Sequence, residues 1–228
     1  MKYHTTRLLY NELNEKYPIV MTRDLEVAKQ WLGTSARGTE RYGMVASSGG
    51  RRLRAEGVWL NSISPENWFL DAEDDVRSSY YLEETATEFD IQGLELDWTL
   101  LAWDANLRFE NNSWKYYNFT GSSWKNVNNL TKQKYLINSY RVLLTRARQG
   151  IVIYIPEGNK NDITRQKEYY DGIYNYFQEI GIVKLSTFDI ADMNFRLQKI
   201  PAIYAKIYEK HQYPTDADIK IIERGYQK

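Results

Sequence analysis

Short apolar runs alternate with stretches of helical periodicity along most of the chain. Residues 18–21 form an apolar run of strand type, and Leu25, Ala28 and Leu32 then recur at helical spacing, with Gly33 where a helix C-cap belongs. This pattern predicts a strand followed by a helix. The further predicted strands are residues 42–46, 82–86, 100–103 and 151–155, and the further predicted helices are residues 132–148, 166–180 and 190–212.

The order of these elements predicts the fold class. Residues 151–155 are a continuous, largely β-branched run, which is typical of a strand buried on both faces of a parallel sheet. Because strands alternate with helices, we predict an α/β fold with a mainly parallel β-sheet flanked by helices. Residues 105–131 break the alternation with many aromatic, Asn and Ser residues, and they predict a hairpin-like insertion.

Composition excludes several classes of chemistry. The 228 residues include no cysteine and only two histidines, so a disulfide scaffold, a cysteine nucleophile and a three-histidine zinc site are excluded. No apolar run approaches the roughly 18 residues of a membrane span, so we expect no membrane partner. The first ten residues lack the apolar core of a signal peptide, and we expect a cytoplasmic location.

Charge is balanced overall but unevenly distributed. Lys plus Arg and Asp plus Glu both number 30. Residues 61–110, however, carry 13 acidic and 2 basic residues, and the stretches on both sides have a basic excess. Basic stretches that share one face of the fold would attract phosphate backbones. Ordinary solvated surfaces explain the same pattern.

Two blocks contain candidate functional residues. Residues 85–97 read TATEFDIQGLELD, in which Gly93 after Gln92 lets the backbone approach a phosphate or ribose, and Glu95 can bond a ribose hydroxyl. Residues 140–148 read YRVLLTRAR and lead directly into the predicted strand 151–155. Arginines at such a junction suit bidentate contact with a phosphate. Alternatively, Arg146 and Arg148 cap a helix C-terminus and pair with acidic neighbours.

The two blocks resemble motifs V and VI of superfamily 1 DNA/RNA helicases. The wider wording is similar to the Schlafen group 3-like DNA/RNA helicase family over roughly residues 17–187, and it includes MVASSGGRRLR at 44–54, DVRSS at 75–79 and WDANLR at 103–108. The resemblance implies that residues 1–188 form the C-terminal RecA-like lobe of a helicase motor, interrupted by the insertion 105–131. Residues 189–228 would then be a helical C-terminal extension.

The resemblance also implies roles for individual residues. Arg146 would be the arginine finger, and Arg23, from a motif IV segment at residues 20–24, would reach the γ-phosphate in the same closed site. Gln92 and Gly93 would lie near the nucleotide or the translocated strand. Glu95 would contact the ribose or couple the lobes. Arg141 and Arg148 are further candidates for contact with the nucleotide phosphates or the other lobe.

The chain departs from the family pattern in one important respect. It contains no G-x-x-x-x-G-K-[ST] phosphate loop, and the run Trp68–Asp71 is too short for a Walker B strand. We therefore expect no ATPase activity from this chain alone. ATP and Mg²⁺ would bind only in a complete two-lobe enzyme, whose Walker-containing RecA-like lobe is supplied in cis or in trans.

Two further patterns suggest contact with DNA or RNA. The first pattern is a Ser-Ser-Gly-Gly turn followed by arginines, and the N–H groups of such a turn can hold a phosphate. Its candidate residues are Ser47, Ser48, Arg51, Arg52 and Arg54. A solvated helix start is the alternative. The second interleaves Trp114, Tyr116, Tyr117 and Trp124 with Lys115 and Lys125, which can stack single-stranded bases. A hairpin that packs its aromatic side chains on the lobe is the more common explanation.

Two other functions stay open beside the motor lobe. The first is a stand-alone, non-catalytic nucleic-acid- or protein-binding module derived from a helicase lobe. The second is a nuclease, for which Asp97 and Asp104 flank a predicted strand without a recognisable partner pattern.

Overall fold

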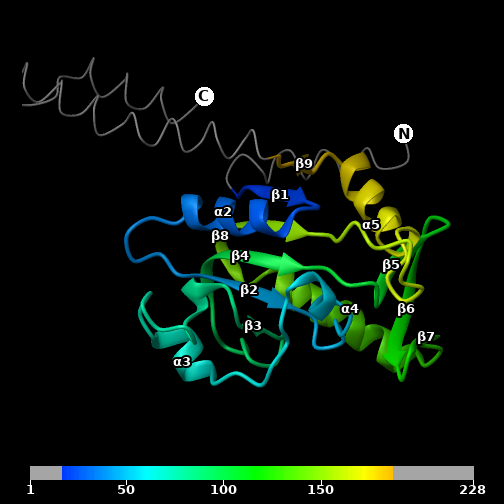
Figure 1. Ribbon diagram of the computed structural model, residues 1–228, viewed down its shortest axis with the longest axis horizontal. Coiled ribbons are helices and arrows are strands. Elements are labelled where there is room, and N and C mark those ends of the chain that lie inside the picture. Colours follow the sequence, from blue (N-terminus) through cyan, green and yellow to red (C-terminus); the bar gives the residue numbers. More distant parts are fainter. Residues whose placement is uncertain (1–16, 187–228) are drawn as a thin grey trace, which may run out of the picture. The chain divides into compact units, whose positions relative to one another are not determined.

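A six-stranded β-sheet forms the centre of the computed structural model, which describes residues 17–186 (Figure 1). The chain divides into two units, Met1–Leu185 and Ser186–Lys228, and only the first is described below. The predicted extension 189–228 and the predicted helix 190–212 lie outside the described residues.

The strands of the central sheet run in the order β3-β2-β4-β8-β1-β9, and every pairing between them is parallel. Their bounds are β1 (Ile19–Thr22), β2 (Tyr42–Ala46), β3 (Thr85–Ala86), β4 (Leu96–Ala102), β8 (Ala147–Tyr154) and β9 (Val183–Lys184). The predicted α/β class with a mainly parallel sheet is confirmed. The apolar run at 151–155 lies in β8 and directly after it, at the centre of the sheet. All five of its residues are buried, as the β-branched pattern predicted.

Helices cover both faces of the sheet. Their bounds are α2 (Leu25–Ser35), α4 (Leu130–Leu144) and α5 (Glu168–Glu179). Met21 and Ile153 belong to one buried cluster with Tyr140 of α4 and Phe177 of α5. Because side chains alternate along a strand, the residues between them face the opposite side, where α2 contacts β1, β4 and β8.

The acidic stretch 61–79 contains a helix that the apolar pattern did not predict. This helix, α3 (Pro65–Leu70), begins after Ser64, whose side chain accepts a hydrogen bond from the Asn67 N–H. Proline at the first helical position and serine at the N-cap are sequence signals for a helix start. Buried Trp68 anchors α3, and its Nε1 donates to the Glu84 carbonyl at 3.1 Å. Short 3₁₀ turns lie at Leu53–Glu56 and Ser79–Tyr81.

The insertion is a separate antiparallel sheet of three strands, as the hairpin-like pattern predicted. Its strands are β5 (Leu107–Glu110), β6 (Ser113–Thr120) and β7 (Ser123–Asn126), in the order β5-β6-β7. Asn111 and Asn112 join β5 to β6 with φ angles of 49° and 59°. Asparagine tolerates this left-handed conformation, which a two-residue hairpin loop requires. The insertion packs on α5 of the lobe.

The predicted helix 132–148 ends too late. α4 stops at Leu144, and β8 begins at Ala147. Thr145 ends the helix, and its hydroxyl donates back to the Arg141 carbonyl at 3.0 Å. Arg148 is therefore in a strand, not at a helix end. The predicted C-cap at Gly33 is also wrong, because α2 continues to Ser35.

Two helical glycines give a matched test of this packing. A Cβ on Gly172 of α5 would overlap the Phe109 carbonyl oxygen of β5, whereas a Cβ on Gly33 of α2 would meet nothing within 4 Å. Gly172→Ala is expected to lower the free energy of unfolding by about 2 kcal/mol, because backbone atoms must shift. Gly33→Ala is expected to raise it by about 0.5 kcal/mol. Urea unfolding measures both, and a Gly172→Ala variant as stable as Gly33→Ala would contradict the close approach of β5 to α5.

Candidate functional site

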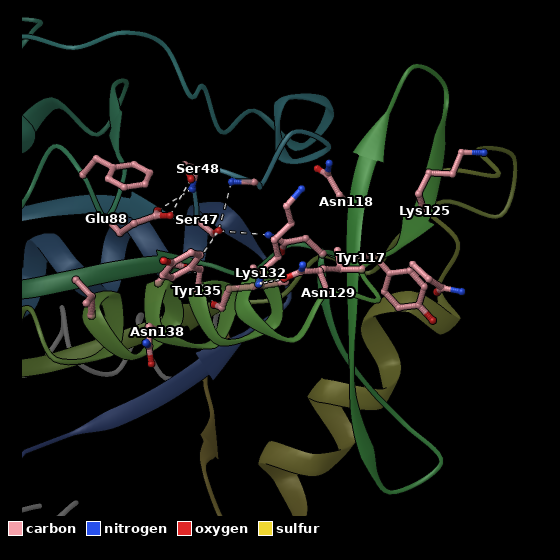
Figure 2. A pocket seen from close by; sticks show the side chains of 18 of the residues that line it. Ser47, Ser48, Glu88, Tyr117, Asn118, Lys125, Asn129, Lys132, Tyr135 and Asn138 are labelled. Atoms are coloured by element: carbon pink, nitrogen blue, oxygen red, sulfur yellow. Dashed lines mark hydrogen bonds between the residues drawn. The ribbon is translucent and has the colours of Figure 1, made fainter.

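A groove with a volume of about 860 Å³ runs along α4. One wall is the exposed side of α4. The other walls are the loop after β2, the turn after β3, and strands β6 and β7 of the insertion. Figure 2 shows Ser48 and Glu88 along one wall, with Lys132, Tyr135 and Asn138 of α4 along the other. Three parts of the chain that lie far apart in the sequence, residues 47–49, 88–92 and 106–146, thus build one concave surface.

The helical repeat of α4 explains which of its residues face the groove. Lys132, Tyr135 and Ser139 line it at spacings of three and four residues, so they share one side of the helix. Tyr140 and Leu143, which do not line the groove, are buried in the core. Leu136 and Val142 add apolar surface to the same wall of the groove.

The loop after β2 is held in place by hydrogen bonds along its wall of the groove. Buried Ser47 accepts hydrogen bonds from the Asn106 side chain and the Gly49 N–H, both at 3.3 Å. Ser48 donates through its N–H at 2.8 Å and its hydroxyl at 2.7 Å to the two carboxylate oxygens of Glu88. The two predicted serines therefore line the groove, but a carboxylate already accepts both Ser48 donors.

A buried polar network lies beneath this loop. Asp104 is fully buried and accepts hydrogen bonds from the Ala105 N–H at 2.7 Å, the Arg52 N–H at 3.0 Å and the Tyr170 hydroxyl at 3.2 Å. The Tyr140 hydroxyl donates to Asn106 at 2.6 Å and accepts from the Asp104 N–H at 3.2 Å. Burial raises the pKa of Asp104 to about 6, although its hydrogen bonds oppose the shift.

The structure brings Gln92 and Arg146 to the same groove. Gln92 lies in the turn between β3 and β4, and Arg146 lies in the junction between α4 and β8. Nη1 of Arg146 donates to the Leu94 carbonyl at 3.4 Å, and its Nε is buried without a hydrogen-bond partner. Among the described residues, no carboxylate forms an ion pair with Arg146. Its guanidinium is held in position without being neutralised.

The structure does not bring Arg23 and Arg146 together. Arg23 follows β1, where Thr22 is level with Tyr154 at the end of β8, whereas Arg146 precedes the first residue of β8. The length of β8 separates them, which is on the order of 25 Å. Arg23 also pairs with Asp171 at 2.5 Å. One phosphate cannot contact both arginines, so Arg23 takes no part in the nucleotide site proposed below.

The other predicted nucleotide-binding residues do not line the groove. Gly93 is exposed in a turn with a φ of 81°, and Glu95 is exposed before β4. Arg148 is exposed on β8 and pairs with Asp97 at 2.7 Å, which raises the pKa of the guanidinium. Arg141 lies on the exposed part of α4 outside the groove.

The predicted arginines after the Ser-Ser-Gly-Gly turn lie outside the groove and in different environments. Arg52 forms an ion pair with Asp162 at 2.9 Å. Arg54 stacks over the Trp59 ring, 4.5 Å from its centroid. Arg51 is exposed. The three guanidinium groups therefore do not form a single cluster for a phosphate.

The aromatic insertion divides into two groups. Trp114, Tyr116 and Trp124 pack against the hydrophobic core of the lobe, as the packing explanation predicted. Tyr117 and Lys125 line the groove. The sequence patterns missed the groove residues of α4 and the asparagines that follow β7. No local signal identifies them, since their role depends on where the insertion packs.

The residues proposed for a nuclease do not converge. Asp97 lies at the start of β4 and Asp104 beyond its end. Within residues 17–186, no group of three or more His, Asp or Glu residues could hold a metal ion. In the same part of the chain, no helix has the length and apolar character needed to cross a membrane.

Comparison with known proteins gives one match. The family model described as Schlafen group 3, DNA/RNA helicase domain, matches residues 2–157. The matched range contains both motif blocks and the strands β1 to β8. No curated protein and no solved structure matches the chain significantly.

Proposed function

Because the chain belongs to the Schlafen group 3 DNA/RNA helicase domain family, we propose that it is the second RecA-like lobe of a nucleic-acid-dependent ATPase. In this role it supplies an arginine finger and part of the nucleic-acid-binding surface. The partner lobe, in cis or in trans, carries the phosphate loop that these 228 residues lack.

The presence of Arg146 and Gln92 in one groove is the observation that carries this proposal. The two motif blocks are far apart in the chain, yet both contribute a side chain to one groove. A guanidinium without a carboxylate partner is suited to neutralise charge on a transferring phosphoryl group. The described residues thus fit an arginine finger, and they contain no group of three or more His, Asp or Glu residues that could hold a metal ion. We expect the partner lobe to hold Mg²⁺ together with ATP.

The part of the groove lined by the insertion and the start of α4 is proposed as the nucleic-acid surface of the same lobe. Lys125 and Lys132 are exposed at the groove, where they can contact phosphates of a bound strand. Tyr117, Tyr135 and several amides complete its lining. A groove of this composition fits a single strand of DNA or RNA better than a small anion.

Strand binding by the purified chain tests this function. The change is the double variant Lys125→Ala/Lys132→Ala, and fluorescence anisotropy with a short single-stranded oligonucleotide is the measurement. We expect the wild-type chain to bind, with an affinity that falls as salt rises. The double variant should reduce the slope of log K against log salt by about 1.4, because each lost phosphate contact removes ~0.7.

The control is Arg77→Ala/Lys184→Ala, which removes the same charge from exposed positions outside the groove. This control should leave the slope unchanged. The wild-type chain alone is expected to hydrolyse no ATP. Absence of strand binding at low salt, or ATP turnover by the pure chain that Arg146→Ala abolishes, would overturn the proposal.

A further inference from the structure

We propose that two copies of this chain associate through unlike surfaces, the outer side of α4 on one copy and an acidic surface at the end of α3 on the other. The outer side of α4 consists of Leu130, Lys134, Ile137 and Arg141, and none of the four lines the groove. The proposal therefore goes beyond the function proposed above and is tested independently of it.

The outer side of α4 combines apolar and basic side chains. Its members are spaced four, three and four residues apart, so they share one side of the helix. Leu130 is 72% exposed, and neither Leu130 nor Ile137 belongs to the hydrophobic core or packs against it. Lys134 and Arg141 are exposed, and within residues 17–186 neither forms an ion pair. A helix side of this kind is suited to an acidic protein surface that also offers apolar side chains.

The acidic surface at the end of α3 offers both. Leu70, the last residue of α3, is 71% exposed, and Val76 is 59% exposed. The loop between them folds back on the end of the helix, because Arg77 forms an ion pair with Asp71 at 3.5 Å. The two apolar side chains therefore lie near each other, with carboxylates on the loop that joins them. The acidic surface consists of Leu70, Glu73, Asp74 and Val76, all of which are exposed.

Charge complementarity makes a second copy of the chain the partner that fits. Residues 61–84 contain seven acidic residues and one basic residue, whereas residues 111–156 contain seven basic residues and no acidic one. The net charge of the chain is zero, so two copies do not repel each other as a whole. Near-zero net charge favours association, and regions of opposite sign set which surfaces meet.

The mass of the chain in solution tests the association. A contact between unlike surfaces leaves one surface of each kind unused in a pair, so further copies can add until a ring closes. In sedimentation equilibrium of the full chain at low salt, we expect the average mass to rise above that of one chain as protein concentration increases. Added salt should reverse the rise, because it screens the attraction. A chain that stayed monomeric at low salt up to about 1 mM would overturn the proposal.

Charge reversal assigns the association to the two surfaces. Lys134→Glu/Arg141→Glu makes both surfaces acidic, and Glu73→Lys/Asp74→Lys makes both basic. Each double variant alone should self-associate at least about tenfold more weakly than the wild type, because like charges then face each other. An equimolar mixture of the two should recover the association, since each surface again meets one of opposite sign. A mixture as weak as the separate variants would contradict the pairing of α4 with the acidic surface.

Matched variants separate this contact from the effect of overall charge. Lys160→Glu/Lys184→Glu and Glu157→Lys/Glu179→Lys change the net charge by the same amounts at exposed positions outside both surfaces. Each should keep most of the wild-type association, because the two surfaces are unchanged. If they lost as much association as the surface variants, overall charge would govern the association and the proposal would be overturned.

Leu130→Ala tests the apolar part of the contact without changing any charge. We expect it to weaken self-association about tenfold, because an apolar side chain at the centre of a contact contributes strongly to its affinity. Ile163→Ala is the control, since Ile163 is equally exposed, at 75%, but lies in another loop. It should leave the association unchanged. Equal effects of the two substitutions would overturn the assignment to the outer side of α4.

Discussion

Arg146→Ala is expected to lower ATP turnover by the assembled motor about 10³-fold. The reason is that Arg146 is fixed between α4 and β8 with no carboxylate partner among the described residues. Its charge is therefore available to a phosphoryl group on the partner lobe. The measurement is single-strand-stimulated ATP hydrolysis by the motor isolated from the cells that produce this chain, with wild-type or variant chain.

Two further variants make the result specific. Arg146→Lys keeps the charge but loses the planar fork, so its turnover should lie between the wild type and Arg146→Ala. Arg77→Ala removes an exposed arginine that pairs with Asp75 and does not line the groove, and its turnover should match the wild type. If Arg146→Ala turned over at the wild-type rate, the motor-lobe proposal would fail. The stand-alone binding module would then be the better explanation of strand binding.

Sequence patterns predicted the central sheet well because its strands have a strong local signal. The run at 42–46 coincides with β2, and the run at 151–155 lies within β8 or directly after it. Patterns failed where a long-range contact decides the structure. The N-terminal half of β8 is polar, and it extends because Ala147 pairs with Leu96 of β4. No local rule shows that pairing, so residues 145–148 read as a continuation of the helix.

In the candidate site, too, the residues with a sequence motif were identified and those placed by long-range contacts were not. Motif resemblance identified Gln92 and Arg146, and both line the groove. Tyr135 was not identified, because one tyrosine on the polar side of a helix has no distinctive pattern. It becomes a site residue only when β6 and β7 pack beside α4. The pairing of Ser48 with Glu88 likewise joins two loops that are distant in the sequence.

Asp104→Ala is expected to lower the free energy of unfolding by about 3 kcal/mol at pH 5. The substitution leaves the Arg52 N–H, the Ala105 N–H and the Tyr170 hydroxyl without an acceptor in a buried site, and each unpaired donor costs about 1 kcal/mol or more. Urea unfolding is the measurement. Asp75→Ala is the control, because Asp75 also accepts three hydrogen bonds, all from exposed Arg77, and water can replace them. Equal losses in the two variants would contradict a structural role for the buried network.

The stability loss in Asp104→Ala should also depend on pH. The pKa of Asp104 is raised by burial from its ordinary value of 3.8 to about 6, so the folded state binds the proton more tightly than the unfolded chain does. Ionised Asp104 therefore costs stability above pH 6, and that cost disappears as the pH falls from about 6 to about 4. Between pH 7.5 and pH 5 the wild type should gain about 1 kcal/mol from this group, and Asp104→Ala should lack the gain. The difference between the two proteins should thus be larger at pH 5 than at pH 7.5. A difference that shrank on acidification would show that Asp104 is ionised more readily in the fold than in the unfolded chain.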